Sequence, residues 1–553
     1  MERRVVLAVL LAIGVLFLTP RLFPPPRRTP VPTAAVDTQV PALTRDSVAT
    51  PRPTVETVRQ PDSVASAPVS APVESVVVRT AEAAYVFRTP GAVLERVELP
   101  QYQALNGTNS TVRLDAQAPL LRYWLVVPND TLRLEPAVFA TTYDTAQRIV
   151  EYTGSAAQWR VKLRYTVNAG YVVRTSGEVT DSTGRPAGDG VYLIVKLPQI
   201  LESFEANTID DRRGTVVAYK PAARGASQTG LGSLDPNELK IEPGPLRWVA
   251  LKSKYFMLGL VSVDTTAPFD ELQIRGLARP DRVTPAADIS IVQRLRGGRI
   301  GFDIYAGPQQ WDAMVAVGRD FESANSYGGW LQPIVQPFAR IVMRVLLWMH
   351  RVLNLHYGWV LLLFGVLVRI AMWPLNQSAM RSSMRMQELQ PLLAEVQKRH
   401  KNDPQRMSAE TMRLYKEHGM SPFSPLAGCF PILLSMPILF ALFFVFQSTI
   451  EFRGVPFLWL QDISLKDPFY IAPLLMGGSM FLTSWLSMRS APPNPQTKIM
   501  TYVLPVMMTV LLANMASGLN LYWAAQNVAS LPQQWLIARE RARARKPHAP
   551  AKK

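Results

Sequence analysis

The sequence predicts a multi-domain chain in which an exported all-β region precedes an α-helical membrane bundle. Three observations predict this architecture. Long apolar runs are concentrated in residues 355–537, whereas residues 76–320 contain short strand-like runs separated by turn residues. The length of 553 residues also exceeds a single domain of about 100–200 residues. A single soluble domain, a fibrous chain and a wholly disordered chain are therefore excluded.

The N-terminal residues predict a membrane anchor over 1–23 and a linker over 24–75. Val5–Leu18 is an apolar run that follows Arg3 and Arg4. A cleaved signal peptide has the same pattern, but no A-x-A cleavage motif follows directly, which favours an uncleaved anchor. The linker is rich in Pro, Val, Thr, Ser and Ala without a hydrophobic period, so it cannot bury a core.

Residues 76–325 predict a β-sandwich, because runs rich in Val, Ile, Tyr and Trp alternate with Gly, Pro, Asp and Asn. No convergent set of His, Asp, Glu or Ser is evident, and solvated turns explain the acidic pairs at 210–211 and 270–271. A binding or scaffolding role is therefore expected. The expected strands are Val93–Leu99, Leu121–Val127, Trp159–Thr166, Tyr171–Thr175, Val191–Val195, Trp248–Leu251, Tyr255–Val263, Ile289–Leu295 and Ile300–Tyr305.

Residues 326–356 predict an amphipathic helix that leads into the membrane. Its apolar residues recur at spacings of three and four. The adjoining span and two tryptophans favour a position in the outer membrane interface. The alternative is packing against the sandwich. The stripe consists of Trp330, Ile334, Phe338, Ile341, Val345 and Trp348.

Five later apolar windows approach the roughly 20 residues that a helix needs to cross a bilayer. With the N-terminal anchor they predict six spans, five of which form the core over residues 357–541. Basic residues are concentrated in residues 378–419 and after the last window, so the positive-inside rule places both segments and both termini in the cytoplasm. The five windows are Tyr357–Pro374, Leu426–Ile450, Phe469–Met488, Ile499–Met515 and Gly518–Ile537.

The sequence lacks the signals of a cofactor-bearing or nucleotide-driven enzyme. Cys429 is the single cysteine, so neither an internal disulfide nor a thiolate metal cage can form. The five histidines do not show the i, i+4 spacing of a zinc helix, and no phosphate-binding glycine loop is present. We therefore expect no cofactor, no metal and no enzymatic activity.

Arg369 lies inside an apolar window, where a charge costs several kcal/mol unless it is hydrated or paired. The five core windows contain no Asp or Glu to pair with it. A hydrated groove open to the cytoplasm is therefore predicted, and snorkelling of the side chain to the inner surface is the alternative. The candidate lining residues, each of which could instead make an ordinary interhelical hydrogen bond, are Gln447, Ser448, Asn514, Asn520, Tyr522, Trp523, Gln526 and Asn527.

Residues 378–419 predict a cytoplasmic helical hairpin, in which Asp403 caps the second helix and Pro404 occupies its first position. Flexible methionine side chains suit contact with varied apolar segments. The alternative is packing between the two helices themselves. The expected contact residues are Met384, Arg385, Met386, Met407 and Met412.

Ordered motifs between about residues 326 and 541 resemble the YidC-type membrane protein insertases of the Oxa/Alb family. Further motifs upstream look like the large periplasmic domain of Gram-negative members. The core motifs are Val368–Leu375, Met384–Pro391, Gly428–Pro431, Met436–Ile438, Asp467–Tyr470, Lys498–Met500 and Ser517–Leu519, and the upstream ones are Trp248–Ala250, Tyr255–Phe256 and Tyr305–Pro308.

The resemblance implies an insertase and chaperone of the bacterial inner membrane that acts alone or with the Sec translocon, without nucleotide hydrolysis. It implies a periplasmic β-supersandwich and five core spans around a groove charged by Arg369. The implied partners are nascent membrane proteins, Sec components, membrane lipids and the ribosome, the last through the hairpin and the basic tail at 542–553. A monomer is compatible with the sequence.

Three positions depart from the family pattern. Gly365 replaces a common hydroxyl residue, Met515-Ala516 replaces Phe-Pro, and Trp523 replaces the second tyrosine of a pair. These departures put the polarity of the groove in doubt. The alternative function is a secondary transporter with a periplasmic binding domain, but the sequence shows neither internal repeats nor midplane acidic residues.

Overall fold

The computed structural model describes residues 74–188, 190–263, 268–279, 284–328, 331–374, 377, 389, 392–396, 398–400, 403–418, 430–489 and 499–544. All of these residues belong to one compact unit, residues 70–553. The predicted anchor and nearly all of the predicted linker lie outside the described residues. So do Met384, Arg385 and Met386 of the hairpin, Cys429, and the tail from residue 545.

The region predicted to be all-β consists of strands, and each expected strand coincides with an observed one. The strands are β1 (Glu74–Arg79), β2 (Ala84–Thr89), β3 (Val93–Gln103), β4 (Thr111–Leu114), β5 (Arg122–Val127), β6 (Asp130–Arg133), β7 (Phe139–Asp144), β8 (Ile149–Ala156), β9 (Trp159–Val167), β10 (Val172–Asp181), β11 (Tyr192–Leu197), β12 (Val216–Pro221), β13 (Ser227–Gly230), β14 (Leu239–Lys252), β15 (Phe256–Ser262), β16 (Phe269–Gly276), β17 (Ala287–Arg294) and β18 (Arg299–Pro308).

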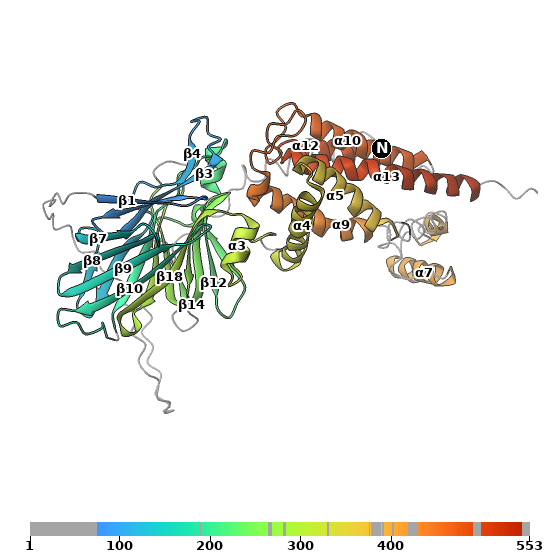
Figure 1. Cartoon of the computed structure of the whole chain (residues 1–553). Helices are drawn as coiled ribbons and strands as arrows, with labels where there is room; N and C mark the ends of the chain where they lie inside the picture. Colours follow the sequence, from blue (N-terminus) through green and yellow to red (C-terminus); the bar gives the residue numbers. More distant parts are fainter. Residues whose placement is uncertain are drawn as a thin grey trace, which may run out of the picture. The chain divides into compact units, whose positions relative to one another are not determined.

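These strands form two sheets, and every described pairing is antiparallel. The smaller sheet has the order β1-β2-β3-β4. The larger one has the order β6-β5-β11-β17-β16-β14-β15-β18-β10-β9-β8-β7, with β12 and β13 joined at β14. Figure 1 shows the neighbouring strands β7, β8, β9, β10 and β18 of the larger sheet.

Successive side chains along a strand point to opposite faces of the sheet, so one face is buried and the other is exposed to solvent. In β9, Val161, Leu163 and Tyr165 are buried, while Lys162 and Arg164 between them are exposed. A one-residue shift of this strand would bury both charges, so the pattern fixes its register against β8 and β10.

The smaller sheet packs on the larger one through a shared aromatic core. The rings of Phe87 in β2 and Tyr165 in β9 lie 4.8 Å apart. The Tyr165 hydroxyl donates to the backbone oxygen of Ala92 at 2.7 Å and lies within hydrogen-bond distance, 2.9 Å, of the Tyr123 hydroxyl. Buried hydroxyls with partners allow tyrosines to fill this core without an unsatisfied polar group.

Helices form the rest of the described chain. Near the strands lie α2 (Thr208–Arg213) and α3 (Trp311–Val317), with short 3-10 turns at Leu231–Ser233, Arg296–Gly298 and Phe321–Ala324. The later helices are α4 (Gln332–Leu353), α5 (Tyr357–Ala371), α7 (Pro404–Glu417), α9 (Phe430–Ser448), α10 (Ile471–Arg489), α12 (Leu504–Leu512) and α13 (Ser517–Ala544), with a 3-10 turn at Ile450–Phe452 and a π turn at Ile499–Val503.

The predicted number of spans is not confirmed by the described helices. Ile471–Met488 alone is long and apolar enough to cross a bilayer, and α4 and α5 pass together only as a pair bent by 119°. Met436–Ser448 and Thr501–Leu512 are apolar but shorter. The 15 residues of α5 span about 22 Å, less than a hydrocarbon core of about 30 Å. Six spans therefore remain a prediction.

Helix α4 has two apolar faces. Its buried face, which includes Ala339, Met343 and Leu346, belongs to the same apolar core as residues of α5 and α9. Trp330 of the predicted stripe lies outside the described residues, and the rest of the stripe lies on the other side, where Ile341 and Trp348 are 59% and 58% exposed. An exposed apolar stripe beside a predicted span is compatible with the expected position in the membrane interface.

Candidate functional site

Arg369 lies in the last turn of α5 and is only partly exposed. Its Nη2 donates to Oε1 of Gln533 in α13 at 2.9 Å, while its Nε is buried without a described partner. None of the carboxylates in the described part of the chain lies within ion-pair distance of it. The guanidinium therefore keeps its positive charge among neutral neighbours.

Gln533 is a site residue that the sequence analysis missed. It is 1% exposed, and its Nε2 donates to the backbone oxygen of Trp373 at 3.2 Å. The amide thus fixes the guanidinium on one side and the end of α5 on the other. The available signal was a glutamine inside the predicted window Gly518–Ile537, directly after Pro532.

Close packing of α5 on α13 positions these groups. A Cβ atom at Gly365 would lie 2.9 Å from the Tyr522 backbone oxygen and 3.3 Å from its ring. The ring of Tyr522 also lies 5.9 Å from that of Phe364. Glycine at 365 therefore permits an approach that a hydroxyl residue would crowd, which explains one departure from the family pattern.

The other candidate residues of α13 take separate positions along the helix. Asn520 is buried and donates to the Leu512 oxygen at 3.1 Å, and Asn527 donates to Ser479 of α10 at 3.1 Å. Both contacts are interhelical hydrogen bonds, the alternative expected for each residue. Trp523 and Gln526 are partly buried.

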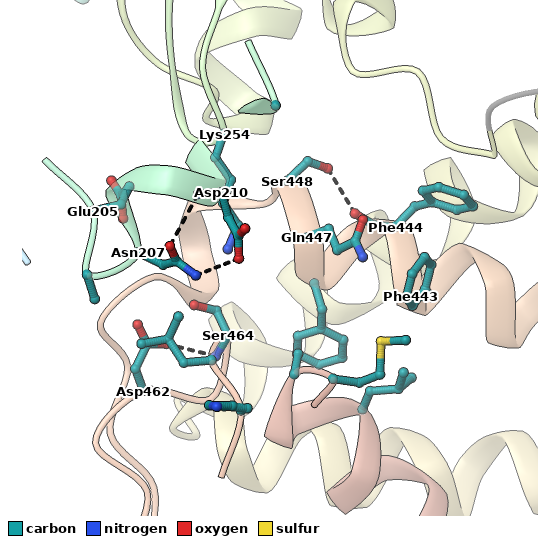
Figure 2. A pocket seen from close by; sticks show the side chains of 18 of the residues that line it. Glu205, Asn207, Asp210, Lys254, Phe443, Phe444, Gln447, Ser448, Asp462 and Ser464 are labelled. Carbon is teal, nitrogen blue, oxygen red and sulfur yellow. Dashed lines mark hydrogen bonds between the residues drawn. The ribbon is translucent and has the colours of Figure 1, made fainter. Parts of the chain in front are cut away.

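Gln447, Ser448 and Asn514 come together at a different place. They line one cavity at the ends of α9 and α12, together with residues of the β-region, and Arg369 is not among the lining residues described for it. In Figure 2, Gln447 and Ser448 face Asn207, Asp210 and Lys254 across this cavity. The predicted lining residues therefore divide between two locations.

The loop between α9 and α10 holds the helices against the β-region. Arg453 Nε lies 2.8 and 3.0 Å from the two carboxylate oxygens of Glu205, and these side chains are 4% and 7% exposed. The Arg453 guanidinium also lies 5.4 Å from the centre of the Phe256 ring. The Arg453 Nη2 also lies 3.4 Å from the Phe204 backbone oxygen, so the buried guanidinium contacts both the side chain of Glu205 and the backbone beside it.

Asp467 organises the end of the same loop. Its carboxylate accepts hydrogen bonds from the N–H groups of Phe469 at 2.9 Å and Ala472 at 2.7 Å, and from the Trp459 indole at 3.0 Å. Burial acts to raise the pKa of Asp467, but these hydrogen bonds outweigh it and hold the pKa below its usual range. The charged carboxylate therefore supports the start of α10.

Two family models match the chain: the YidC periplasmic domain over residues 75–341 and the 60Kd inner membrane protein over residues 348–545. The membrane protein insertase YidC of Maridesulfovibrio salexigens is 29% identical over 97% of this chain and 99% of that protein. That of Chlorobium luteolum is 35% identical over 54% of this chain and 52% of that protein, so this match spans about half of the relative.

The chain belongs to the YidC family of membrane protein insertases. It is thus an inner-membrane protein of the YidC type with a periplasmic domain. A crystal structure of an active YidC insertase covers 84% of this chain and 92% of its own, with 16% identity and a TM-score of 0.34. These values are low, and the architecture above is established by the chain's own strands and helices.

Of the predicted hairpin, the structure describes mainly α7. Asp403 caps this helix by accepting from the Arg406 N–H at 3.0 Å, as the sequence predicted. Tyr415 of α7 packs on Leu389 of the preceding segment. Met407 is partly buried and Met412 is 43% exposed, so Met412 is available for contact with another chain.

Potential metal ligands are sparse in this YidC protein. Within the described ranges, no group of three or more His, Cys, Asp or Glu side chains could hold a metal ion.

Proposed function

We propose that this chain inserts client proteins into the inner membrane by drawing a short exported segment into a polar groove charged by Arg369, without nucleotide hydrolysis. The observation that carries the proposal is the neutral surrounding of this arginine. Its described hydrogen bond goes to the Gln533 amide at 2.9 Å, and no described carboxylate neutralises it. Such a charge is available to an incoming acidic group.

The strength of this attraction depends on the low dielectric around Arg369. Two unit charges 4 Å apart interact by about 1 kcal/mol in water and by about 4 kcal/mol at an effective dielectric of 20. A partly buried guanidinium therefore attracts an acidic residue more strongly than a surface arginine does. The gain offsets part of the desolvation that polar groups of the client suffer when they leave water.

The client itself supplies the driving free energy. Transfer of its apolar span into lipid contributes roughly 25 cal/mol per Å² of apolar surface removed from water. A span of about 20 residues gains enough to carry a short polar segment across. The absence of a phosphate-binding loop from the sequence supports a mechanism without nucleotide hydrolysis.

The orientation in this proposal follows from charge. The hairpin and the C-terminal tail face the cytoplasm, and the β-region faces the periplasm. Exposed basic residues of the hairpin, such as Arg399, Arg406 and Arg413, support this arrangement. Nascent chains, the ribosome, lipids and Sec components are the proposed partners. The family assignment favours insertion over the transporter alternative.

The test compares Arg369→Lys and Arg369→Ala in proteoliposomes that contain the full chain and no nucleotide. We expect Arg369→Lys to retain most insertion activity, because the positive charge remains. We expect Arg369→Ala to lower insertion of a single-span client with an acidic exported tail by about tenfold or more, equivalent to roughly 1.4 kcal/mol.

The matched control is the same client with its acidic residues changed to amides. Its insertion should be nearly unaffected by Arg369→Ala, because the charge attraction is absent. Normal insertion of the acidic client by Arg369→Ala would contradict the mechanism and leave the arginine a snorkelling residue.

A further inference from the structure

The loop between α9 and α10 contains a tight turn with a leucine at its tip. Backbone hydrogen bonds between Phe457 and Leu460 close the turn, with N–H to oxygen distances of 2.8 and 2.9 Å. Leu458 takes the first central position with a φ of +52°, and it is 66% exposed. A two-residue turn with positive φ at this position normally has glycine there, because a bulky side chain is strained. This leucine is therefore unfavourable both in its backbone and in its contact with water.

The base of the turn is fixed at the start of α5. The buried ring of Phe457 packs against Gly358 and lies 5.3 Å from the ring of Trp359. These two are the second and third residues of α5, and Trp359 is itself 52% exposed. The leucine tip is thus held close to the point where a predicted span begins.

A second exposed aromatic ring is tied to the same turn through Asp467. Its carboxylate accepts hydrogen bonds from the indole of Trp459 at 3.0 Å and from the N–H of Phe469 at 2.9 Å. The backbone of Phe469 is therefore fixed, yet its side chain is 66% exposed. Helix α10 begins two residues later, so this ring also lies at the end of a predicted span.

The turn and the residues around it present no charge. Residues 454–461 contain no Asp, Glu, Lys or Arg. Asp462 and Asp467, which follow the turn, are buried and accept hydrogen bonds from backbone N–H groups. Arg453, which precedes it, is held by Glu205. The exposed surface of the turn is therefore apolar and aromatic.

We propose that this turn inserts into the bilayer as a lipid anchor that does not cross it. Leu458 enters the acyl chains, and the rings of Trp359 and Phe469 lie near the headgroups, where aromatic side chains are favoured. Removal of the leucine from water offsets the strain of its backbone. In the orientation proposed above, this is the outer leaflet. The anchor goes beyond the insertase function and does not depend on the mechanism at Arg369.

Lipid fits this surface better than a protein partner does. A protein interface combines an apolar centre with a polar rim and hydrogen bonds, whereas the turn exposes apolar side chains and keeps its carboxylates occupied. The apolar surface also continues from Phe469 to Leu474 and Leu475 of α10, which are 63% and 51% exposed. Among the described helices, α10 alone is long and apolar enough to cross a bilayer without a bend. Continuity with this helix assigns the turn to lipid.

The test places an environment-sensitive fluorophore at Leu458→Cys of the full chain, in nanodiscs that each hold one copy. Cys429→Ser first removes the natural thiol. The matched control is Ile241→Cys, since Ile241 is an apolar residue of β14 that is 48% exposed. Lipids with a spin label on the upper acyl chain quench the fluorophore on contact. We expect quenching at position 458 to be about fivefold stronger than at position 241.

A second pair of proteins tests the leucine itself. The fluorophore is placed at Phe469→Cys, and Leu458 is either retained or changed by Leu458→Asn. Asparagine tolerates positive φ, so the turn keeps its shape and loses its apolar tip. We expect Leu458→Asn to lower lipid quenching at position 469 by about twofold.

Two results would overturn the proposal: equal lipid quenching at positions 458 and 241, or quenching at position 469 that Leu458→Asn leaves unchanged. A third would assign the tip to a second copy of the chain and overturn it as well. In that case lipid does not quench the fluorophore at position 458, and an aqueous quencher loses access to it only when two copies share a disc.

Discussion

Arg453 and Arg369 are both largely shielded from water, but Arg453 is paired with a carboxylate and Arg369 is not. Arg453 is bound by both oxygens of Glu205 and lies over the Phe256 ring. Arg369 has the neutral amide of Gln533 as its described partner. The first arrangement joins two parts of the structure, whereas the second keeps a charge available. Burial of an arginine therefore does not reveal its role until its partner is known.

The largest expected effect comes from removal of the paired arginine. Arg453→Ala leaves Glu205 buried without its cation, which should lower the free energy of unfolding by about 3 kcal/mol. Burial already raises the pKa of Glu205 to about 7 against the lowering effect of Arg453, so the stranded carboxyl can take up a proton and limit the loss. Thermal unfolding of the detergent-solubilised protein measures it.

The matched control for this variant is Arg174→Ala. Arg174 also binds a carboxylate at two points, on Asp303 at 3.0 and 3.2 Å, but it is 54% exposed. Its loss should lower stability by less than about 1 kcal/mol. Equal losses in the two variants would show that burial does not distinguish these pairs.

The next effect concerns packing beside the loop that carries Arg453. A Cβ atom at Gly358 would lie 2.0 Å from the Phe457 ring, so Gly358→Ala should lower the free energy of unfolding by about 2 kcal/mol. Gly478→Ala in α10 is the control, since nothing lies within 4 Å of its Cβ position. That control should be neutral or slightly stabilising, because alanine favours helix. Similar unfolding temperatures for both variants would contradict the close contact.

A third prediction gives Arg369 a carboxylate partner, so that it becomes ion-paired as Arg453 is. Gln533→Glu places a carboxylate 2.9 Å from the guanidinium without changing the length of the side chain. We expect insertion of an acidic-tailed client to fall about tenfold while insertion of its neutral twin changes little. Gln533→Met removes the hydrogen bond but adds no charge, so it should preserve the preference for acidic tails. Loss of that preference in both variants would assign Gln533 a purely positional role.

The smallest expected effect is a pH dependence of the free energy of unfolding that arises from Glu451, in the loop between α9 and α10. Glu451 accepts from the Trp311 N–H at 3.1 Å, and burial raises its pKa to about 7. Because the folded pKa exceeds the unfolded one, the stabilisation is complete at low pH and is lost as pH rises through about 7. Glu451→Gln should therefore remove about 1 kcal/mol of difference in unfolding free energy between pH 6 and pH 8. An unchanged pH profile in this variant would contradict the assignment.

Local patterns explain which parts of the fold could be predicted. The alternation in Trp159–Val167 determines a strand, and Asp403 before Pro404 determines the start of α7, because each depends on neighbouring residues only. Arg369 could be singled out because a charge in an apolar window is unfavourable in any arrangement of the helices. These signals do not require knowledge of what lies opposite.

The rest depends on contacts between distant residues. Glu205 and Arg453 are 248 positions apart, and neither residue stands out in the sequence as half of a buried pair. Gln447 and Asn514 were assigned to the same groove as Arg369 because all are polar residues of spans. The periodicity of a helix does not say at which end of the bundle a polar residue lies, and the structure places these two in a separate cavity.

The bend of 119° between α4 and α5 has a consequence for the lipid bilayer. The 22 residues of α4 extend about 33 Å, and a helix with side chains is about 10 Å wide. With α4 in the outer interface, as the sequence predicts, the protein occupies roughly 330 Å² of the outer leaflet that it does not occupy in the inner one. This asymmetric displacement would thin the outer leaflet beside the bundle and shorten the path that a client's polar segment must travel.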